Sequence, residues 1–352
     1  MAVSQSFAKH ILVRSSRVCS VAVLSNSIPN RSSFSTQISF EETTAEILNR
    51  INSVVEDPSI SREEICLSYI RKLCADGNLL AAARLPESLR GKQIFVGPRA
   101  YNHLLEAADA INDIEMLSQV FIDLLVSCGS VTLDSYLIVA RTIGKHHHTV
   151  LLNFIARVCK SELQRIDIVL NRFIYALGKC GYADSALFVV DHMKSLKIKP
   201  DLFTYNIVLA VLGRLGRADE LLRVFEFMKT IDLITPDIVT YNTVLHCVRK
   251  MGRLDLCLLY FKEMGEKGIR PDLITYKALV ESLGRSGNIE EALKVFYEIK
   301  RRGITPSVHI YRALIFSLKK MGKIELASEL STEMNKLLRP ASVPRDSQYK
   351  SR

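Results

Sequence analysis

Basic side chains recur at a regular interval along most of this 352-residue sequence. Six of them form a series in which each is 34 to 36 residues from the next: Lys145, Lys179, Arg214, Lys250, Arg285 and Lys320. Each closes an apolar run with helical spacing, where one cation can complement the partial negative charge of a helix C-terminus. Six cations in register also predict a track that neutralises successive phosphates of a nucleic acid. A formal net charge of +10 is consistent with such a polyanionic partner.

Residue patterns typical of catalysis, metal binding or nucleotide binding do not occur in the sequence. The eight Cys include no C-x-x-C pair, and we interpret them as buried thiols. His146, His147 and His148 are not accompanied by a second cluster of ligands, which favours a solvated loop. No Walker loop, dinucleotide fingerprint or zinc-deaminase signature is present. We therefore expect no cofactor, no metal, no small-molecule substrate and no catalytic activity.

The N-terminal segment has the composition of an organellar import signal. Before the first acidic residue, Glu41, it is rich in Ser and contains four basic residues: Lys9, Arg14, Arg17 and Arg31. We expect a mitochondrial transit peptide over residues 1–34, cleaved near Ser35, and a linker over 35–62. A mitochondrial matrix location is favoured over a chloroplast address or a disordered basic N-terminus. The apolar stretch around residues 18–24 is shorter than the roughly 20 residues that span a bilayer, so no membrane anchor is expected.

A repeat of about 35 residues places the basic residues in equivalent positions. Its period is marked by one large residue in each unit: Tyr101, Tyr136, Leu170, Tyr205, Tyr241, Tyr276 and Tyr311. The period predicts eight units, at 63–97, 98–132, 133–166, 167–201, 202–237, 238–272, 273–307 and 308–342. Residues 343–352 remain as a tail.

Each unit has the pattern of two amphipathic helices joined by a glycine turn. Residues 202–213 are apolar at helical spacing, Gly213 and Gly216 interrupt the pattern, and a second run covers 218–228. Pro236 and Asp237 end the unit, because Pro cannot continue a helix and Asp can cap the next one. One hairpin cannot bury both apolar faces, so neighbours must stack into an all-α solenoid. The expected core residues are Ala186, Ala292, Ala327, Phe225, Phe261, Phe296, Met193, Met228 and Met264.

The period, the T-Y-N opening at Thr204 and Thr240, the glycine turn and the closing Pro-Asp together resemble P-type pentatricopeptide repeats. The resemblance is strong in the last five units and weak in the first three. It implies a right-handed α-solenoid of about eight helix-turn-helix hairpins, in an organelle-targeted protein of the plant type. It also implies binding of single-stranded organellar RNA, about one base per repeat.

In that family the fifth and last residues of a unit contact the base edge. The corresponding pairs here are Asn171 with Asp201, Asn206 with Asp237, and Asn242 with Asp272. The resemblance implies that each pair prefers uridine, since an amide can donate to and accept from a pyrimidine edge while Asp orients it. Three successive pairs therefore predict a U-U-U reader. A purely structural role, with Asp as a helix N-cap and Asn in a first-turn hydrogen bond, is the alternative.

The other units depart from the family's pattern at the fifth position. Asn102, with Thr132, suits a pyrimidine. The residues that match no common base are Leu67, Leu137, Lys277 and Arg312. Three positions before the fifth residue, four units have apolar residues that are expected to stack on bases: Ile168, Phe203, Val239 and Ile274. Burial against the neighbouring repeat is the alternative role for these four.

Two functions agree with this pattern. The first is a sequence-preferring RNA-binding protein that acts in the stabilisation, processing, splicing or translation of an organellar transcript with a U-rich core. The second is a structural or assembly subunit of an organellar RNA–protein complex, such as the mitochondrial ribosome. The Asn/Asp pairs favour the first function, and the unmatched flanking units favour the second.

Overall fold

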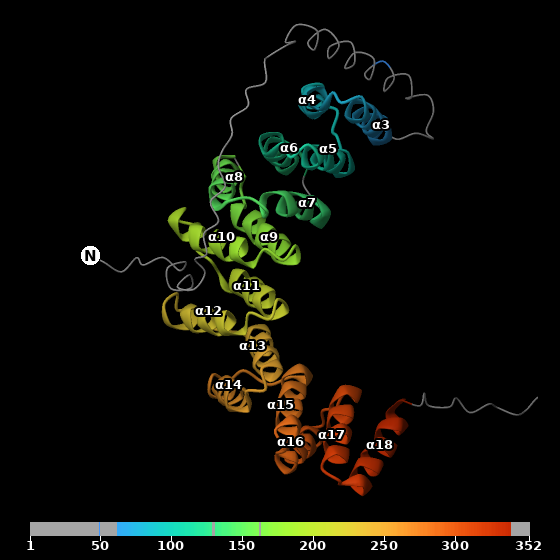
Figure 1. Cartoon of the computed structure of the whole chain (residues 1–352), viewed down its shortest axis with the longest axis vertical. Helices are drawn as coiled ribbons and strands as arrows, with labels where there is room; N and C mark the ends of the chain where they lie inside the picture. The colour runs from blue at the N-terminus through green and yellow to red at the C-terminus, as the bar shows by residue number, and fades with distance from the viewer. Residues whose placement is uncertain (1–48, 50–61, 129–130, 162, 339–352) are drawn as a thin grey trace, which may run out of the picture. The chain divides into compact units, whose positions relative to one another are not determined.

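The computed structural model describes residues 62–128, 131–161 and 163–338, together with residue 49. Sixteen α-helices and no strand occur in this part of the chain, as the sequence predicts for an all-α fold (Figure 1). The expected transit peptide, the C-terminal tail and nearly all of the linker lie outside the described residues.

The helices follow one another along the chain as eight helix-turn-helix hairpins. The first helices of the hairpins are α3 (Arg62–Ala75), α5 (Pro98–Ala110), α7 (Leu133–Ile143), α9 (Ile166–Lys179), α11 (Leu202–Arg214), α13 (Ile238–Lys250), α15 (Leu273–Arg285) and α17 (Val308–Lys320). The second helices are α4 (Leu79–Arg90), α6 (Ile114–Ser127), α8 (His148–Lys160), α10 (Ala183–Ser195), α12 (Ala218–Thr230), α14 (Leu254–Glu266), α16 (Ile289–Arg301) and α18 (Ile324–Leu338). Only three or four residues join the two helices of each hairpin.

The turn between α13 and α14 shows why a glycine follows most first helices. Gly252 has a φ of +72°, a conformation that residues with a Cβ rarely adopt. This conformation lets the N–H of Arg253 donate to the carbonyl of Val248 at 3.1 Å and close the helix. In the hairpin of α5 and α6, Asn112 adopts the same conformation, with a φ of +55°.

The chain divides into two compact units, each larger than a single repeat, and their boundary lies within α11, between Val211 and Leu212. In the N-terminal unit the first helices α3, α5, α7 and α9 pack against one another in chain order. In the C-terminal unit α13, α15 and α17 do the same. Each unit is therefore a stack of hairpins in which the first helices form one layer, the organisation of an α-solenoid.

The core of each unit consists largely of the residues that the sequence predicts. Eight of the nine expected core residues are at most 1% exposed. The exception is Phe261, which is only half-buried on α14. Edge-to-face contacts join successive hairpins: the rings of Phe225 on α12 and Tyr241 on α13 are 5.7 Å apart, at 75°. Phe296 on α16 and Tyr311 on α17 repeat this contact at 5.1 Å and 78°.

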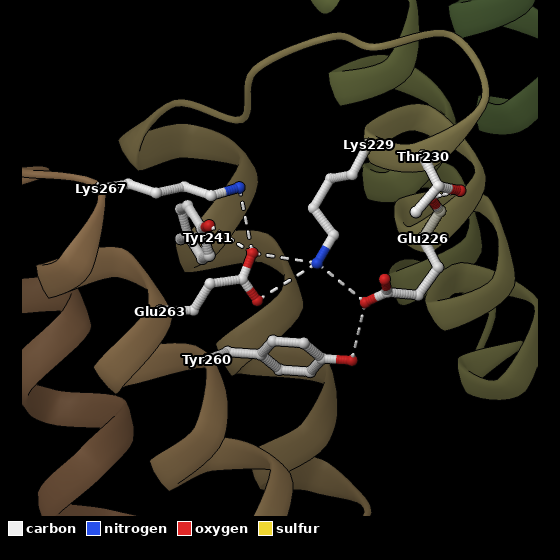
Figure 2. A network of polar contacts seen from close by, with 7 residues as sticks. All are labelled: Glu226, Lys229, Thr230, Tyr241, Tyr260, Glu263 and Lys267. Carbon is white, nitrogen blue, oxygen red and sulfur yellow. Dashed lines mark hydrogen bonds and ion pairs between the residues drawn. The ribbon is translucent and has the colours of Figure 1, made fainter.

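A polar network connects α12 with α13 and α14 (Figure 2). The Glu263 carboxylate accepts hydrogen bonds from Lys229 Nζ at 3.0 Å and from the Tyr241 hydroxyl at 2.9 Å. The Lys229 side chain is only 13% exposed and also pairs with Glu226 at 3.0 Å. Burial acts to raise the pKa of Glu263, but hydrogen bonds from Lys229, Tyr241 and Lys267 outweigh it and hold that pKa below its usual value. The carboxylate is therefore charged near neutral pH and links two hairpins.

The same combination of a cation, a tyrosine and an acid occurs at two other junctions between hairpins. These triads are Arg90 with Tyr101 and Asp123, and Lys300 with Tyr311 and Glu333. The Tyr101 hydroxyl donates to Asp123 at 2.7 Å, and the Tyr311 hydroxyl donates to Glu333 at 2.8 Å. In all three triads the acid follows the tyrosine by 22 residues. The repeated Tyr thus connects hairpins through its hydroxyl as well as through its ring.

Candidate nucleic-acid interface

Asn242 and Asp272, one of the three expected base-reading pairs, are in direct contact. The Asn242 side-chain amide donates to both carboxylate oxygens of Asp272, at 3.2 and 3.1 Å. The Thr275 hydroxyl lies 2.7 Å from the Asn242 oxygen and 3.0 Å from Asp272 Oδ1. The amide of Asn242 is consequently held between α13 and the start of α15. With one N–H of Asn242 shared between the two oxygens of the Asp272 carboxylate, the second N–H and one oxygen lone pair of the amide remain for a ligand.

Asp272 also caps a helix. Its carboxylate accepts from the N–H groups of Ile274 and Thr275, each at 2.9 Å, at the start of α15. The same carboxylate orients Asn242, so capping does not exclude a role in base reading. Burial acts to raise the pKa of Asp272, but hydrogen bonds from Thr275, Asn242 and Ile274 lower it by more. Asp272 is therefore ionised near neutral pH and only accepts hydrogen bonds.

Asn171, in the N-terminal unit, lies in a related arrangement but is less accessible. The Thr204 hydroxyl, at the start of α11, lies 2.9 Å from Asn171 Oδ1 and 2.8 Å from Asp201 Oδ1. Asn171 is only 4% exposed, whereas Asp201 is exposed. Asp201 is thus the accessible member of this pair.

Asn206 belongs to the N-terminal unit and Asp237 to the C-terminal unit. Asn206 is half-buried on α11. Asp237 caps α13 by accepting from the Thr240 N–H at 2.8 Å, while the Thr240 hydroxyl accepts from the Asp237 N–H at 3.2 Å. Asp237 therefore has the same place at its helix start as Asp272 has on α15.

Asn102 is held in a similar way by different partners. Its side-chain amide donates to Thr132 Oγ1 at 3.4 Å, and its Oδ1 accepts from the Ser135 hydroxyl at 2.6 Å. The hydroxyls of Thr132 and Ser135 are 3.1 Å apart. Hydroxyl groups replace the carboxylate here, so the amide is oriented without a negative charge.

A hydroxyl group in the following repeat is the component of the site that sequence reasoning missed. Ser135, Thr204 and Thr275 each lie 33 residues after the Asn that they bind. The signal was present in the T-Y-N opening, where a Thr precedes the buried Tyr. Its role was not apparent because the contact forms only when two hairpins stack.

The four residues expected to stack on bases are exposed on their first helices. The exposed fractions are 37% for Ile168, 63% for Phe203, 54% for Val239 and 60% for Ile274. Burial against the neighbouring repeat, the alternative role, is therefore wrong for Phe203, Val239 and Ile274 and holds only in part for Ile168. Each is three residues from a fifth-position side chain, a spacing that places both on one helix face.

The six basic residues of the expected phosphate track are all exposed. Five of them are the last residue of a first helix: Lys179, Arg214, Lys250, Arg285 and Lys320. The expectation that Lys145 closes a first helix is wrong. Helix α7 ends at Ile143 with Gly144 as its cap, and Lys145 lies in the following turn. Within the described ranges none of the six forms an ion pair, in contrast to Arg249, which pairs with Glu281. The six charges are therefore available to an anion.

The fifth position differs in the remaining hairpins. Leu67 is 3% exposed and Leu137 is half-buried, so both contribute to packing. Lys277 lies 4.0 Å from the Glu281 carboxylate. Arg312 is exposed on α17 and forms no ion pair with any residue that the structure describes. Lys277 and Arg312 thus have different surroundings despite their similar charge.

The cysteines are less uniformly buried than expected. Cys66, Cys247 and Cys257 are buried thiols. The expectation is wrong for four others, which are only half-buried: Cys74, Cys128, Cys159 and Cys180. Desolvation raises the pKa of all seven thiols that the structure describes, which disfavours the reactive thiolate.

The histidine cluster is partly helical instead of lying wholly in a loop. His148 is the first residue of α8, and its ring stacks on Phe188 with centroids 4.2 Å apart. His147 caps this helix by accepting from the Thr149 N–H at 3.4 Å. Across the described ranges, no group of three or more His, Cys, Asp or Glu is placed to hold a metal ion. None of the described helices is long and apolar enough to cross a membrane.

A model of the pentatricopeptide repeat domain matches residues 166–215, 188–251, 223–285 and 259–323. Together these matches extend from α9 to α17. A curated pentatricopeptide repeat-containing protein of Arabidopsis thaliana is 40% identical over 152 residues, which are 42% of this chain and 41% of the relative. The alignment therefore covers less than half the length of that relative.

Several solved structures also match parts of the chain. The maize pentatricopeptide repeat protein PPR10 is 22% identical with a TM-score of 0.45, covering 86% of this chain and 44% of its own. A structure of PPR10 in complex with an 18-nucleotide psaJ RNA element is 17% identical, with a TM-score of 0.47, covering 85% and 44%. The pentatricopeptide repeat domain of Arabidopsis thaliana protein-only RNase P 1, in complex with tRNA, is 18% identical with a TM-score of 0.44, covering 50% and 92%.

Proposed function

Because the chain belongs to the pentatricopeptide-repeat family, we propose that it binds single-stranded RNA and reads one base with each of several successive repeats. The target that we propose has a U-U-U core, read by the hairpins that begin with α9, α11 and α13. The RNA lies parallel to the chain, so that Asn171 and Asp201 are nearest its 5′ end. Binding of this kind guides, protects or remodels a transcript without a chemical step by the chain itself.

The contacts of Asn242, Asp272 and Thr275 carry this proposal. Asp272 only accepts hydrogen bonds, so the NH₂ group of Asn242 must face it. The carbonyl oxygen then faces the Thr275 hydroxyl at 2.7 Å, and the amide cannot turn over without losing both contacts. Uridine offers its O4 as an acceptor beside its N3–H donor, whereas cytidine offers a donor beside an acceptor. A fixed amide therefore favours the uridine order of the two groups.

Apolar and cationic groups near Asn242 also support the proposal that this hairpin binds RNA. Val239, 54% exposed, is three residues before Asn242 and provides a surface on which the base can lie. Lys250, exposed and eight residues after Asn242, provides a charge for the adjoining phosphate. The amide determines which base is preferred, while the apolar and basic groups contribute affinity for any base.

Competition binding tests this proposal. Full-length protein is titrated with RNAs of one length whose cores are U-U-U, U-U-C, U-U-G or U-U-A, and fluorescence anisotropy reports the affinity. We expect U-U-U to bind more tightly by about 1 to 3 kcal/mol. Asp272→Asn should reduce the preference at the third base, because Asn also caps helices but its amide no longer dictates the orientation of Asn242. Asp255→Asn, at an exposed carboxylate on α14, is the matched control. Equal affinity for all four cores contradicts the proposal.

We also propose that the protein acts in the mitochondrial matrix, since its N-terminal segment is basic and free of acidic residues up to Glu41. An assembly role in an organellar RNA–protein complex is the second candidate. It is favoured by Leu67 and Leu137, which pack inside the N-terminal unit instead of offering a polar group to a base. Co-sedimentation of the protein with ribosomal subunits after nuclease treatment supports the second candidate, and release by nuclease supports the first.

A further inference from the structure

The face of α17 that corresponds to the base-reading face of α13 has an unusual composition. Arg312 occupies the position of Asn242, and His309, Phe316 and Lys320 lie on the same side of the helix, at spacings of three or four residues from their neighbours. All four are exposed, and Phe316 is exposed by 69%. None of the four forms an ion pair with a residue in the described part of the chain. We call these four residues the α17 stripe.

The corresponding positions on α13 and α15 carry polar side chains in place of the aromatic ring. His246 on α13 and Glu281 on α15 occupy the Phe316 position, and both contact Arg249. The residue that corresponds to Arg249 on α15 is Gly284, which packs against Ser317 of α17 and has no polar side chain to take the place of Arg249. On α17 an exposed aromatic ring thus occupies a position that holds a paired polar group on α13 and α15.

We infer that the α17 stripe binds a guanine nucleotide of the RNA, an inference that rests on the proposed function. An exposed aromatic ring flanked by cations is the combination that stacks a base and neutralises its phosphate. Arg312 provides paired N–H donors that match the O6 and N7 acceptors of guanine, whereas adenine has one acceptor on that edge and pyrimidines lack N7. Lys320, one turn beyond Phe316, contacts the phosphate.

The intervening hairpin separates this guanine from the uridines. Lys277, at the fifth position of α15, is half-buried and lies beside Glu281, so we assign it no base preference. The hairpins that begin with α13, α15 and α17 follow one another in the C-terminal unit. The preferred RNA is therefore U-U-U-N-G in the 5′ to 3′ direction, where N is any base.

Anisotropy competition with full-length protein tests the inference, using RNAs that contain U-U-U-A-G, U-U-U-A-A or U-U-U-A-C. Wild type should favour G over C by about tenfold. Arg312→Lys keeps the charge but loses the paired donors, so this ratio should fall to about one while binding persists. Phe316→Ala should weaken all three RNAs by about tenfold, and Phe316→Trp should restore the affinity. Tyr297→Ala, at a half-exposed ring on the second helix α16, should have no effect.

The outcomes separate this inference from the proposed function. If wild type prefers U-U-U but binds the G, A and C forms equally, the α17 stripe has no base preference and the inference is overturned. If Phe316→Ala and Tyr297→Ala weaken binding to the same extent, the stacking assignment is wrong. If replacement of the uridines changes nothing, the proposed function itself fails. Both mutated rings are exposed, so circular dichroism should show an unchanged helical content in every variant.

Discussion

Replacing Glu263 with Gln perturbs the network of Figure 2 without changing the size of the side chain. The carboxylate is 21% exposed and accepts from Lys229, Tyr241 and Lys267. Gln keeps an oxygen for the Tyr241 hydroxyl but removes the charge that balances Lys229. Removal of one partner from a buried ion pair costs about 3 to 5 kcal/mol. Because Glu226 still pairs with Lys229 and the site is partly exposed, we expect a loss of about 2 kcal/mol in the free energy of unfolding.

Urea unfolding followed by circular dichroism measures this loss. With a slope of about 2 kcal/mol per M, the expected decrease in the midpoint is about 1 M. Glu266→Gln is the matched control, because Glu266 and Lys262 form a pair with side chains 63% and 77% exposed, and its loss should cost less than about 0.5 kcal/mol. Since a helical-repeat chain can unfold in more than one step, the C-terminal transition is fitted separately.

A double-mutant cycle with Lys229→Met identifies the origin of the effect. If the ion pair is responsible, the double variant should be more stable than the sum of the single losses predicts, by about 1 kcal/mol or more. Additive losses, or equal effects of Glu263→Gln and Glu266→Gln, would show that the network contributes no more than a surface pair and would refute this reasoning.

Four further predictions concern the RNA and the ends of the chain. Asn206→Thr, with Asp237 unchanged, should move the preference at the central base from U toward G by about 1 to 3 kcal/mol, as competition with U-G-U cores would show; equal weakening for every core contradicts this. Charge reversal at four positions of the phosphate track together, Lys179, Arg214, Lys250 and Arg285, should lower the affinity for all RNAs alike and reduce the slope of log affinity against log salt concentration. An unchanged slope would show that these residues do not contact phosphates. The pKa of Asp272 in the folded state is lower than its usual value, so the contribution of this carboxylate to the free energy of unfolding should be complete above about pH 4 and be lost as the pH falls through the folded-state pKa. Asp272→Asn should therefore reduce the acid sensitivity of thermal unfolding, and a pH profile identical to that of wild type would contradict this prediction. The mature protein should begin near Ser35, and N-terminal sequencing that finds Met1 in the organelle would contradict the import prediction.

The hairpins and their core follow from local rules that a single sequence displays. The recurrence of Gly252-type turns and of Pro-Asp sequences determines where helices begin and end, and the apolar period determines which face is buried. Phe261 is the exception among the expected core residues. Its place in the apolar period predicts burial, but how much of the ring is covered depends on the packing of neighbouring hairpins, which the period does not indicate. The end of α7 was also misplaced, since Gly144 stops this helix two residues before the basic position.

The candidate site was only partly predictable because its contacts form between hairpins. The period located Asn242 and Asp272, but nothing in the spacing indicated that Thr275 would hold the Asn242 carbonyl. The burial of Asn171 was equally hidden, because it depends on the packing of Thr204 over the amide. The spacing shows that Arg312 matches no common base, but the exposure of the nearby Phe316 ring depends on how the hairpins pack.

The hydrogen bonds of Asn242 have a consequence for how such arrays can be recombined. Its two partners are the last residue of its own repeat and the third residue of the next, Asp272 and Thr275. A chimera cut after Asp272, at the end of the repeat, transplants the amide without the hydroxyl that fixes its direction. Exchange at a point beyond Thr275 keeps all three groups together, so the smallest interchangeable element of recognition overlaps the next repeat by three residues.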